Sequence, residues 1–429
     1  MDDDTRRLDV PMPDGLVLRR AARDTLRSDL APLVTAFSDP WTDEEWAARS
    51  PAFVVERIVT AFDGEEPVAC AGAEGFMLTV PGGEVAAGGL TLVGVLPTHR
   101  RRGILRAIIR QQLDAYRARG EAVSILWASE GAIYQRFGYG LATIRSAFEV
   151  DRSRVAFLRP ADPIGRMRLV TLDEAHRLFP PIYDAVRVVT PGALTRDASM
   201  WRLGVLYDSA SAAGEAGPKY LAVHETAGVP DGYAIYRVKP GWEPRGPKGA
   251  LSVREVVGTS PAIESAIWRW VLDIDLVAKV TGDMLPTPPA LLLALAEPRR
   301  LGVTLSDGLW LRLLDLPAAL MARRYAMPGR LVLRVADAFC PWNAGTWSLE
   351  VDGPRDGTAW HQARVAPAGT GDVPDLDLDV ADLGAAYLGG TRFEDLRAAD
   401  RVRELVPGAV RRADRMFAAD RTPSCSTMF

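Results

Sequence analysis

LVGVLPTHRRRGILR, residues 92–106, is the stretch that decides the fold of this sequence. It reads as the end of an apolar strand, then a turn rich in arginine, then the start of a helix. Apolar residues recur downstream at i, i+3, i+4, i+8 and i+11, which predicts an amphipathic helix over 102–119 that ends at Gly120. Those apolar positions are Leu105, Ile108, Ile109, Leu113 and Tyr116.

The turn before this helix has the character of an anion site. A helix N-terminus carries free backbone N–H groups and a partial positive charge, Gly103 removes side-chain bulk, and the arginines add full charges. The turn therefore suits a pyrophosphate. A solvated basic helix start is the alternative, since the 51 basic residues of this chain are nearly all arginine. The turn lacks the glycine spacing of a P-loop or of a dinucleotide-binding fold.

Strand and helix signals alternate on both sides of this turn. The order strand, helix, strand predicts a βαβ unit with a parallel or mixed sheet, and hence an α/β fold. A second α/β stretch and a third segment of strands and helices follow. Strands are expected over 68–80, 90–95, 123–128, 253–257, 331–335 and 347–351, and later helices over 263–272, 393–405 and 409–419.

A chain of 429 residues is long enough for two to four domains. A charged stretch with two prolines follows residue 150 and marks a first boundary, and a new segment opens near Trp310. We therefore divide the chain into domains at 1–150, 151–309 and 310–429.

Composition and charge exclude several classes of protein. Hydrophobic residues at 48% and charged residues at 25% are typical of a globular protein and argue against disorder. The net charge of -4 disfavours a nucleic-acid partner, and no apolar run approaches the roughly 18–20 residues of a membrane span. Three distant cysteines and four scattered histidines form neither a disulfide framework nor a metal site, so we expect a cytoplasmic protein without a metal.

Two longer motifs give the sequence a family resemblance. Residues 100–105 resemble motif A of the GNAT acetyltransferases, Arg/Gln-x-x-Gly-x-Gly/Ala, except that Leu105 replaces the last small residue. The enhanced-intracellular-survival (Eis) acetyltransferases share this departure, and their run P-T-H-R-R-R-G-(I/L)-L-R-A is present at 97–107. Their second signature, W-A-S-E-x-x-I-Y-x-R-F-G-Y-G, is present at 127–140. The layout is also similar down to LDLDVADLGAAYLGG at 376–390 and a C-terminal phenylalanine.

The resemblance implies a catalytic GNAT domain, a degenerate central copy of that fold, and an α+β C-terminal domain similar to sterol carrier proteins. It implies transfer of acetyl from acetyl-CoA to a primary amine, and we expect a cationic small molecule such as an aminoglycoside as the acceptor. It also implies a homohexamer. We expect no nucleic acid, membrane or metal among the partners.

Carried over residue by residue, the motifs give a cofactor site. Val93, Gly94 and Val95 would pair with the pantetheine arm, and the N–H of Val95 would polarise the thioester carbonyl. A bulge that Gly94 permits would expose that N–H. Ser129 and Glu130 would border the arm. The pyrophosphate would be held by Arg101, Arg102, Gly103, Ile104, Leu105 and Arg106.

The family also implies two catalytic groups. Tyr134 would be the acid that protonates the departing CoA thiolate, whereas the neighbouring Tyr139 is expected to pack in the core. The attacking amine, with a pKa near 10.4, must first lose a proton. The terminal carboxylate takes that part in the family, and its counterpart here belongs to Phe429, acting directly or through water.

Weaker candidates complete the list of possible sites. The Asp-Leu alternation at 375–379 resembles a calcium loop, but Val380 replaces the required glycine, so we expect a half-buried strand. Asp39 and Trp46 lie in the region that often lines the acceptor pocket, although Asp39 is as well explained as a helix cap. Two alternative functions remain open, a protein lysine acetyltransferase and a non-catalytic protein that carries an apolar ligand.

Overall fold

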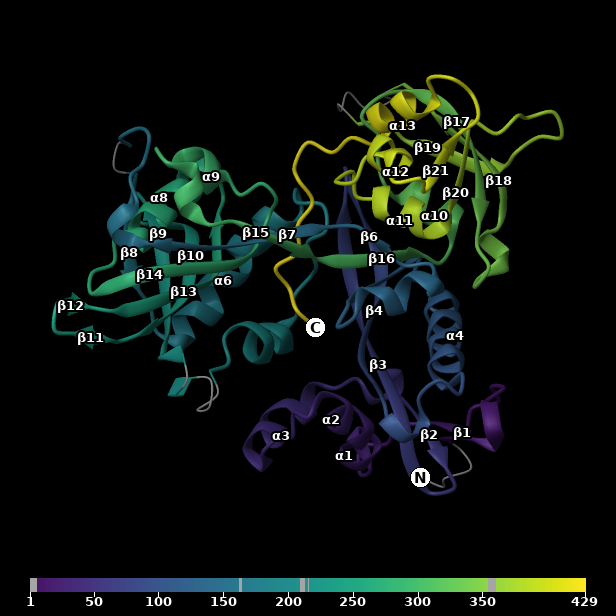
Figure 1. Ribbon diagram of the computed structural model, residues 1–429, viewed down its shortest axis with the longest axis horizontal. Coiled ribbons are helices and arrows are strands. Elements are labelled where there is room, and N and C mark those ends of the chain that lie inside the picture. Colours follow the sequence, from purple (N-terminus) through teal and green to yellow (C-terminus); the bar gives the residue numbers. More distant parts are fainter. Residues whose placement is uncertain (1–5, 162–163, 209–212, 215, 354–359) are drawn as a thin grey trace.

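The computed structural model describes residues 6–161, 164–208, 213–214, 216–353 and 360–429. Three larger sheets organise these residues, two with seven strands and one with five, beside a small hairpin of β11 (Trp242–Glu243) and β12 (Gly246–Pro247). The two seven-stranded sheets lie in separate halves of the molecule, and the five-stranded sheet lies beside the first of them (Figure 1).

The first sheet has the strand order β1-β2-β3-β4-β5-β16-β6, and only its β4–β5 pair is parallel. The predicted βαβ unit in a mixed sheet is therefore confirmed. Its helix begins at Ile104 rather than at Arg102, because Arg101 and Gly103 take left-handed conformations with φ of 65° and 86°. The elements are β1 (Val17–Arg20), α1 (Leu26–Asp29), α2 (Ala31–Phe37), α3 (Asp43–Arg49), β2 (Val59–Asp63), β3 (Glu66–Val80), β4 (Gly83–Val95), α4 (Ile104–Ala118), β5 (Val123–Trp127), α5 (Gly131–Tyr134), β6 (Gly140–Leu141) and β16 (Leu309–Leu313).

The second sheet repeats this plan, with a parallel β13–β14 pair joined through α8. The two sheets exchange strands. β7 begins at Ile144, within the range expected for the first domain, but lies in the second sheet, and β16 begins at Leu309, at the end of the range expected for the central domain, but lies in the first sheet. The elements are β7 (Ile144–Asp151), β8 (Arg166–Leu169), α6 (Leu172–Arg187), β9 (Lys219–Thr226), β10 (Val229–Lys239), β13 (Gly249–Gly258), α8 (Pro261–Leu272), β14 (Val277–Leu285), α9 (Ala290–Ala294) and β15 (Thr304–Asp307).

The C-terminal sheet has the order β19-β18-β17-β20-β21. The helix expected over 393–405 was wrong in its second half: it ends at Ala398, Asp400 turns the chain with φ 58°, and a strand follows. The calcium-like run forms the half-buried strand β20, where Asp377 pairs with Arg334 at 2.6 Å. The elements are α10 (Leu316–Ala322), β17 (Gly329–Ala336), β18 (Gly345–Val351), β19 (Ala363–Pro367), β20 (Leu376–Asp379), α11 (Val380–Ala386), α12 (Phe393–Ala398), β21 (Val402–Glu404) and α13 (Ala409–Phe417).

The first sheet is buried on both faces. On one face, Ile108 and Leu113 of α4 pack with apolar residues of β2, β3 and β4. On the other face, Leu78 and Val85 share a core with the C-terminal domain. The backbones also meet, since a Cβ at Gly140 would lie 1.8 Å from the carbonyl oxygen of Ala381 in α11. The C-terminal domain is thus part of the support of the first sheet.

Candidate active site

The strands β4 and β5 pair over only three residues of each, 87–89 and 123–125. Beyond Gly89, β4 contains a bulge, because its register with β3 jumps from Thr91↔Gly72 to Gly94↔Cys70. The bulge bends β4, so that Val93 and Val95 lie on a stretch of backbone that β5 does not pair. Such an edge can pair with an extended ligand arm, as the pantetheine prediction requires.

Gly94 serves a different purpose from the expected one. The left-handed residue of the bulge is Leu92, with φ 54°, and not Gly94. A Cβ at Gly94 would lie 2.6 Å from the Cα of Leu33, so glycine is needed there because α2 packs directly on β4.

The turn at the start of α4 has the features of an anion site. Gly103 is the N-cap residue, and no side chain in the described part of the chain caps the helix. The first backbone N–H groups of α4 are therefore available to a ligand. Arg101 is exposed, whereas Arg102 forms an ion pair with Asp14 at 2.7 Å.

Three more residues, Ile104, Leu105 and Arg106, were predicted to bind the pyrophosphate, through the backbone or through the side chain. Ile104 is 1% exposed and packs in the core, so only its backbone can serve the site. Leu105 is half-buried against the same core. The guanidinium of Arg106 lies 5.1 Å from the ring centroid of Phe339 in the C-terminal domain, which orients it by a cation–π contact.

Tyr134 ends α5, shortly after β5. Its ring is buried and meets Tyr139 edge to face at 6.0 Å. Burial, with a smaller contribution from the charge of Glu130, raises the pKa of Tyr134 to about 12, so the hydroxyl keeps its proton at neutral pH. The Tyr139 hydroxyl is 2.7 Å from Ser124 Oγ inside the sheet. Ser129 and Glu130 lie exposed between β5 and Tyr134.

The C-terminal tail runs between the two halves of the molecule and ends there (Figure 1). Phe429 lines a cavity of about 640 Å³, and its ring centroid is 4.8 Å from that of Phe76 on β3. A Cβ at Gly89 would lie 2.9 Å from the Phe429 ring and 2.6 Å from the Phe76 ring, so glycine on β4 makes room for both rings. The chain end is therefore seated against β3 and β4.

Two further acidic residues line this cavity, and the sequence interpretation missed both. Glu74 comes from β3, and Asp197 comes from the central domain. Burial and then the charge of Asp197 raise the pKa of Glu74. One signal for Glu74 was present, since it is the only charged residue in the apolar run 68–80. The cavity is lined by Trp41, Arg49, Ala52, Phe53, Val54, Glu74, Gly75, Phe76, Thr91, Leu92, Thr195, Arg196, Asp197, Ser199, Met200, Leu203, Gly204, Arg254, Met428 and Phe429.

The two weak pocket candidates lie outside this lining. Asp39 is exposed in the turn after α2, and the N-cap of α3 is Thr42, so Asp39 does not cap that helix either. Trp46 packs at 5.5 Å against Trp41, which does line the cavity. Trp46 therefore supports the cavity wall from behind.

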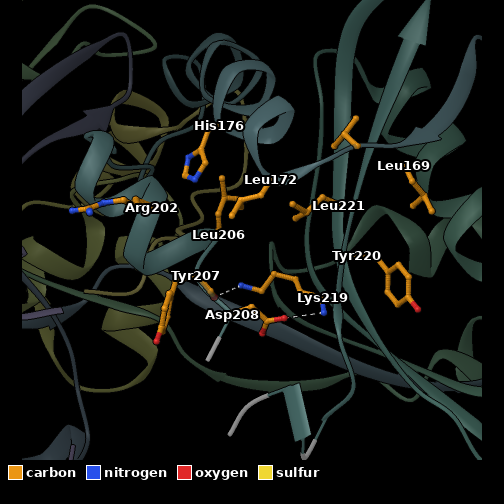
Figure 2. A pocket seen from close by; sticks show the side chains of 11 residues that line it. Leu169, Leu172, His176, Arg202, Leu206, Tyr207, Asp208, Lys219, Tyr220 and Leu221 are labelled. Atoms are coloured by element: carbon orange, nitrogen blue, oxygen red, sulfur yellow. Dashed lines mark hydrogen bonds between the residues drawn. The ribbon is translucent and has the colours of Figure 1, made fainter. Parts of the chain in front are cut away.

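A second cavity, of about 480 Å³, lies in the central domain (Figure 2). Of the lysine and arginine side chains that line it, Lys219 and Arg202, the first is already engaged, because Lys219 Nζ donates to the carbonyl oxygens of Val205 at 2.9 Å and Tyr207 at 2.6 Å. Burial lowers the pKa of Lys219 to about 8. None of the predicted cofactor or catalytic residues lines this cavity, so the first cavity is the candidate site.

Comparisons with known proteins show the family of this chain. The N-acetyltransferase Eis of Mycobacterium tuberculosis is 35% identical over 83% of this chain and 84% of its own. The chain belongs to the Eis family of GNAT N-acetyltransferases. An uncharacterized N-acetyltransferase of Streptomyces coelicolor is 39% identical over 95% of this chain and 97% of its own. The solved structure of Eis1 from Mycobacterium abscessus superposes with a TM-score of 0.79 and 32% identity, covering 96% of this chain and 100% of that one.

Family models also match each part of this Eis-family chain. Two acetyltransferase (GNAT) domain models match 18–142 and 192–313, and a sterol carrier protein domain model matches 316–426. The protein is thus an N-acetyltransferase with two GNAT domains and a sterol-carrier-like C-terminal domain. GNAT domains use acetyl-CoA as the acetyl donor. In the described residues no group of histidine, cysteine, aspartate and glutamate could hold a metal ion, and no helix is both long and apolar enough to cross a membrane.

Proposed function

We propose that the first GNAT domain, for which we keep the range 1–150, transfers acetyl from acetyl-CoA to a primary amine of a polycationic small molecule such as an aminoglycoside. One observation carries the proposal: the chain end reaches a cavity that both GNAT domains line, beside the bulged strand β4. Of the predicted cofactor and catalytic residues, Phe429 lines this cavity, and Thr91 and Leu92 of β4 line it beside the predicted cofactor strand. In our proposal the cofactor and Tyr134 would approach the cavity from that strand.

The cofactor would lie along the unpaired edge of β4 and across the start of α4. The backbone of Val93 and Val95 would pair with the pantetheine arm, and the Val95 N–H would polarise the thioester carbonyl. The N–H groups at the start of α4, with Arg101, Arg102 and Arg106, would hold the pyrophosphate. Ser129 and Glu130 would border the arm from the end of β5.

The base in this proposal is the carboxylate of Phe429. An ammonium group with a pKa near 10.4 must lose a proton before its nitrogen can attack the thioester carbon. A terminal carboxylate is a weak base, so it would act best through a water that passes the proton outward. Attack then forms the C–N bond, and collapse of the tetrahedral intermediate breaks the C–S bond.

Tyr134 would supply the proton for the departing thiolate. Because its pKa of about 12 lies above the roughly 8.5 of a thiol, full transfer to a free thiolate is uphill. The hydroxyl would therefore act first as a hydrogen-bond donor to the sulfur as its charge develops. That contribution lowers the barrier of C–S cleavage without affecting cofactor binding.

The carboxylates of the cavity support this acceptor class. Glu74, Asp197 and the terminal carboxylate would attract the several ammonium groups of a polycation. Arg196 also lines the cavity, but it is paired with Glu255 at 2.7 Å. Arg49 and Arg254 line the wall as well, so the preference for cations depends on those three carboxylates.

We also propose that the enzyme acts in the cytoplasm as a homohexamer, which the family resemblance implies. Light scattering coupled to size-exclusion chromatography measures the assembly directly. A mass near six times the 46.6 kDa of the chain supports the proposal, and a monomer contradicts it.

The proposal is tested by measuring CoA release with aminoglycosides, polyamines and lysine peptides as acceptors. We expect aminoglycosides to give the highest kcat/KM. Deleting Phe429, or fusing a tag after it, should abolish turnover, because the carboxylate is then displaced or converted to an amide. An N-terminal tag of the same length is the control and should leave turnover unchanged. Full turnover from the C-terminally tagged enzyme would refute the base, and a preference for lysine peptides would refute the acceptor class.

A further inference from the structure

A buried hydrogen-bond network in the central domain contacts the C-terminal tail. Arg196 and Glu255 form a two-fold contact, with Nη1 to Oε2 at 3.0 Å and Nη2 to Oε1 at 2.7 Å. Their side chains are 1% and 6% exposed. Glu255 lies on β13, far from the first domain in sequence, and Arg196 follows a segment that is hydrogen-bonded to β3 through Thr195 N–H and Met77 O at 3.0 Å.

Arg196 and Glu255 also form hydrogen bonds with the hydroxyl groups of two tail residues, Ser426 and Thr427. Ser426 Oγ accepts from Arg196 Nη2 at 3.0 Å and donates to Glu255 Oε1 at 2.6 Å. Thr427 Oγ1 accepts from Arg196 Nε at 2.9 Å. Tyr233 donates to the other oxygen of Glu255 at 2.8 Å. The three guanidinium nitrogens and both carboxylate oxygens are thus engaged, so the network specifies one position of the tail.

The first domain holds the same tail residue from the opposite side. Trp127, the last residue of β5, donates its indole N–H to the carbonyl oxygen of Thr427 at 3.0 Å. Only two residues separate Thr427 from the end of the chain, and an extended chain spans about 3.5 Å per residue. Fixing Thr427 therefore limits the Cα of Phe429 to within about 7 Å of the Thr427 Cα, and the seat of the Phe429 ring against Phe76 restricts the chain end further.

The charges of the pair are appropriate for a fixed anchor. Burial alone would raise the pKa of Glu255, but Arg196, Ser426 and Tyr233 together lower it. Glu255 therefore stays ionised at neutral pH. A buried ion pair adds little net stability compared with apolar packing, whereas removal of one partner leaves the other buried and uncompensated.

We propose that Arg196 and Glu255 are positioning residues that hold the Ser426 and Thr427 hydroxyls and so aim the Phe429 carboxylate at the acceptor amine. The inference rests on the proposed role of that carboxylate as the base. It gives the central GNAT domain a task in catalysis without a cofactor of its own. The domain acts as the anchor of a base that the first domain uses.

Thr427→Val is the most informative variant, because it removes the hydroxyl while keeping the shape of the side chain. Two measurements are needed: the rate at which a carboxypeptidase releases Phe429, and kcat with KM for acetyl-CoA. We expect release to accelerate 10- to 100-fold and kcat to fall by a similar factor, with KM for acetyl-CoA unchanged. Thr427→Ser restores a hydroxyl and should recover most of both values.

Glu255→Gln should give the same two changes, provided that the variant folds, since it leaves Arg196 buried without its charge partner. Glu225→Gln is the matched control: Glu225 lies in the same sheet and is held by Arg166 and Arg168 rather than by the tail. Glu225→Gln should leave Phe429 release and kcat unchanged.

The outcomes separate the two proposals. Wild-type release and wild-type kcat in Thr427→Val would overturn the anchor. Faster release with wild-type kcat would uphold the anchor and refute the carboxylate as the base. Loss of turnover on deletion of Phe429, together with a wild-type Thr427→Val, would keep the base and refute the anchor.

Discussion

The two GNAT domains contain the same strand, turn and helix, but only one of them leaves its helix start open. In the first domain, Gly103 precedes α4 and no described side chain caps the helix. In the central domain, Ser260 precedes α8, and its hydroxyl accepts from the Ile263 N–H at 3.3 Å. Pro261 there lacks an N–H, and Glu264 puts a negative charge in the first turn. A side chain thus caps the start of α8, whereas the first backbone N–H groups of α4 remain available to an anion.

The two domains also differ in the segment that follows the second strand of the parallel pair, β5 in the first domain and β14 in the central domain. In the first domain, β5 leads into α5, which ends on the buried phenol of Tyr134. In the central domain, β14 leads through a proline-rich loop into α9, whose sequence ALLLA has no proton donor. In our proposal the central copy keeps the fold without the chemistry. What remains in the central copy is a rigid sheet, which in our proposal anchors the tail.

Replacement of Tyr134 by phenylalanine tests the chemical half of this contrast, with the largest expected effect. We expect kcat to fall by about 100-fold or more, with little change in the dissociation constant of acetyl-CoA, because the proton is needed only as the C–S bond breaks. Tyr139→Phe is the matched control. It removes the bond to Ser124 and should cost about 1 kcal/mol of stability while leaving kcat near wild type. A more damaging Tyr139→Phe would reverse the assignment.

The open helix start is tested by replacing Arg101 and Arg102 with alanine. We expect the dissociation constant of acetyl-CoA to rise about 10- to 100-fold in isothermal titration calorimetry, because charge-assisted contacts to the pyrophosphate are lost. Replacing Arg299 and Arg300, which lie in a short helix of the central domain, removes the same charge elsewhere. That control should bind acetyl-CoA like the wild type. Equal affinity in both double variants would remove the turn from the cofactor site.

The variant Glu74→Gln tests whether the carboxylate that the first domain places in the cavity wall favours cationic acceptors. We expect KM for an aminoglycoside to rise about tenfold, since one carboxylate facing the acceptor becomes neutral. KM for acetyl-CoA should stay unchanged, because Glu74 does not lie at the helix start. An unchanged aminoglycoside KM would show that the carboxylate makes no contact with the acceptor.

The same variant makes a prediction about stability and pH. The folded-state pKa of Glu74 is raised by burial and by Asp197, so its ionised form destabilises the fold above that pKa. Glu74→Gln should therefore increase the free energy of unfolding at neutral pH. The gain should disappear as the pH falls below the unfolded-state value of about 4.3, where wild-type Glu74 is protonated in both states. A gain that persists at low pH would point to packing rather than charge.

Ser260→Ala tests the closed helix start and has the smallest expected effect on catalysis. Loss of the cap should lower the free energy of unfolding by about 1 kcal/mol, measured by chemical denaturation. Acetyl-CoA affinity and kcat should both remain at wild-type values. A change in cofactor affinity would mean that the central helix start also takes part in binding.

The sequence was sufficient for features that depend on local pattern. Residues 92–106 predicted the strand, turn and helix, and the aromatic end of the chain suggested that Phe429 is seated rather than frayed. It was insufficient for contacts between distant segments. Ser426 and Glu255 are 171 residues apart, and nothing in the strand around Glu255 marks it as a partner of the tail. The exchange of β7 and β16 was missed for the same reason, because each strand looks ordinary by itself.

The stoichiometry of acetyl-CoA binding tests the division of labour between the two GNAT domains most directly. Calorimetric titration of the wild type should give one site per chain, and the double replacement of Arg101 and Arg102 should weaken that site. Two sites per chain would place a cofactor in the central domain as well, and one site whose affinity is unaffected by the loss of both arginines would remove the turn before α4 from the cofactor site. Either result would contradict the account.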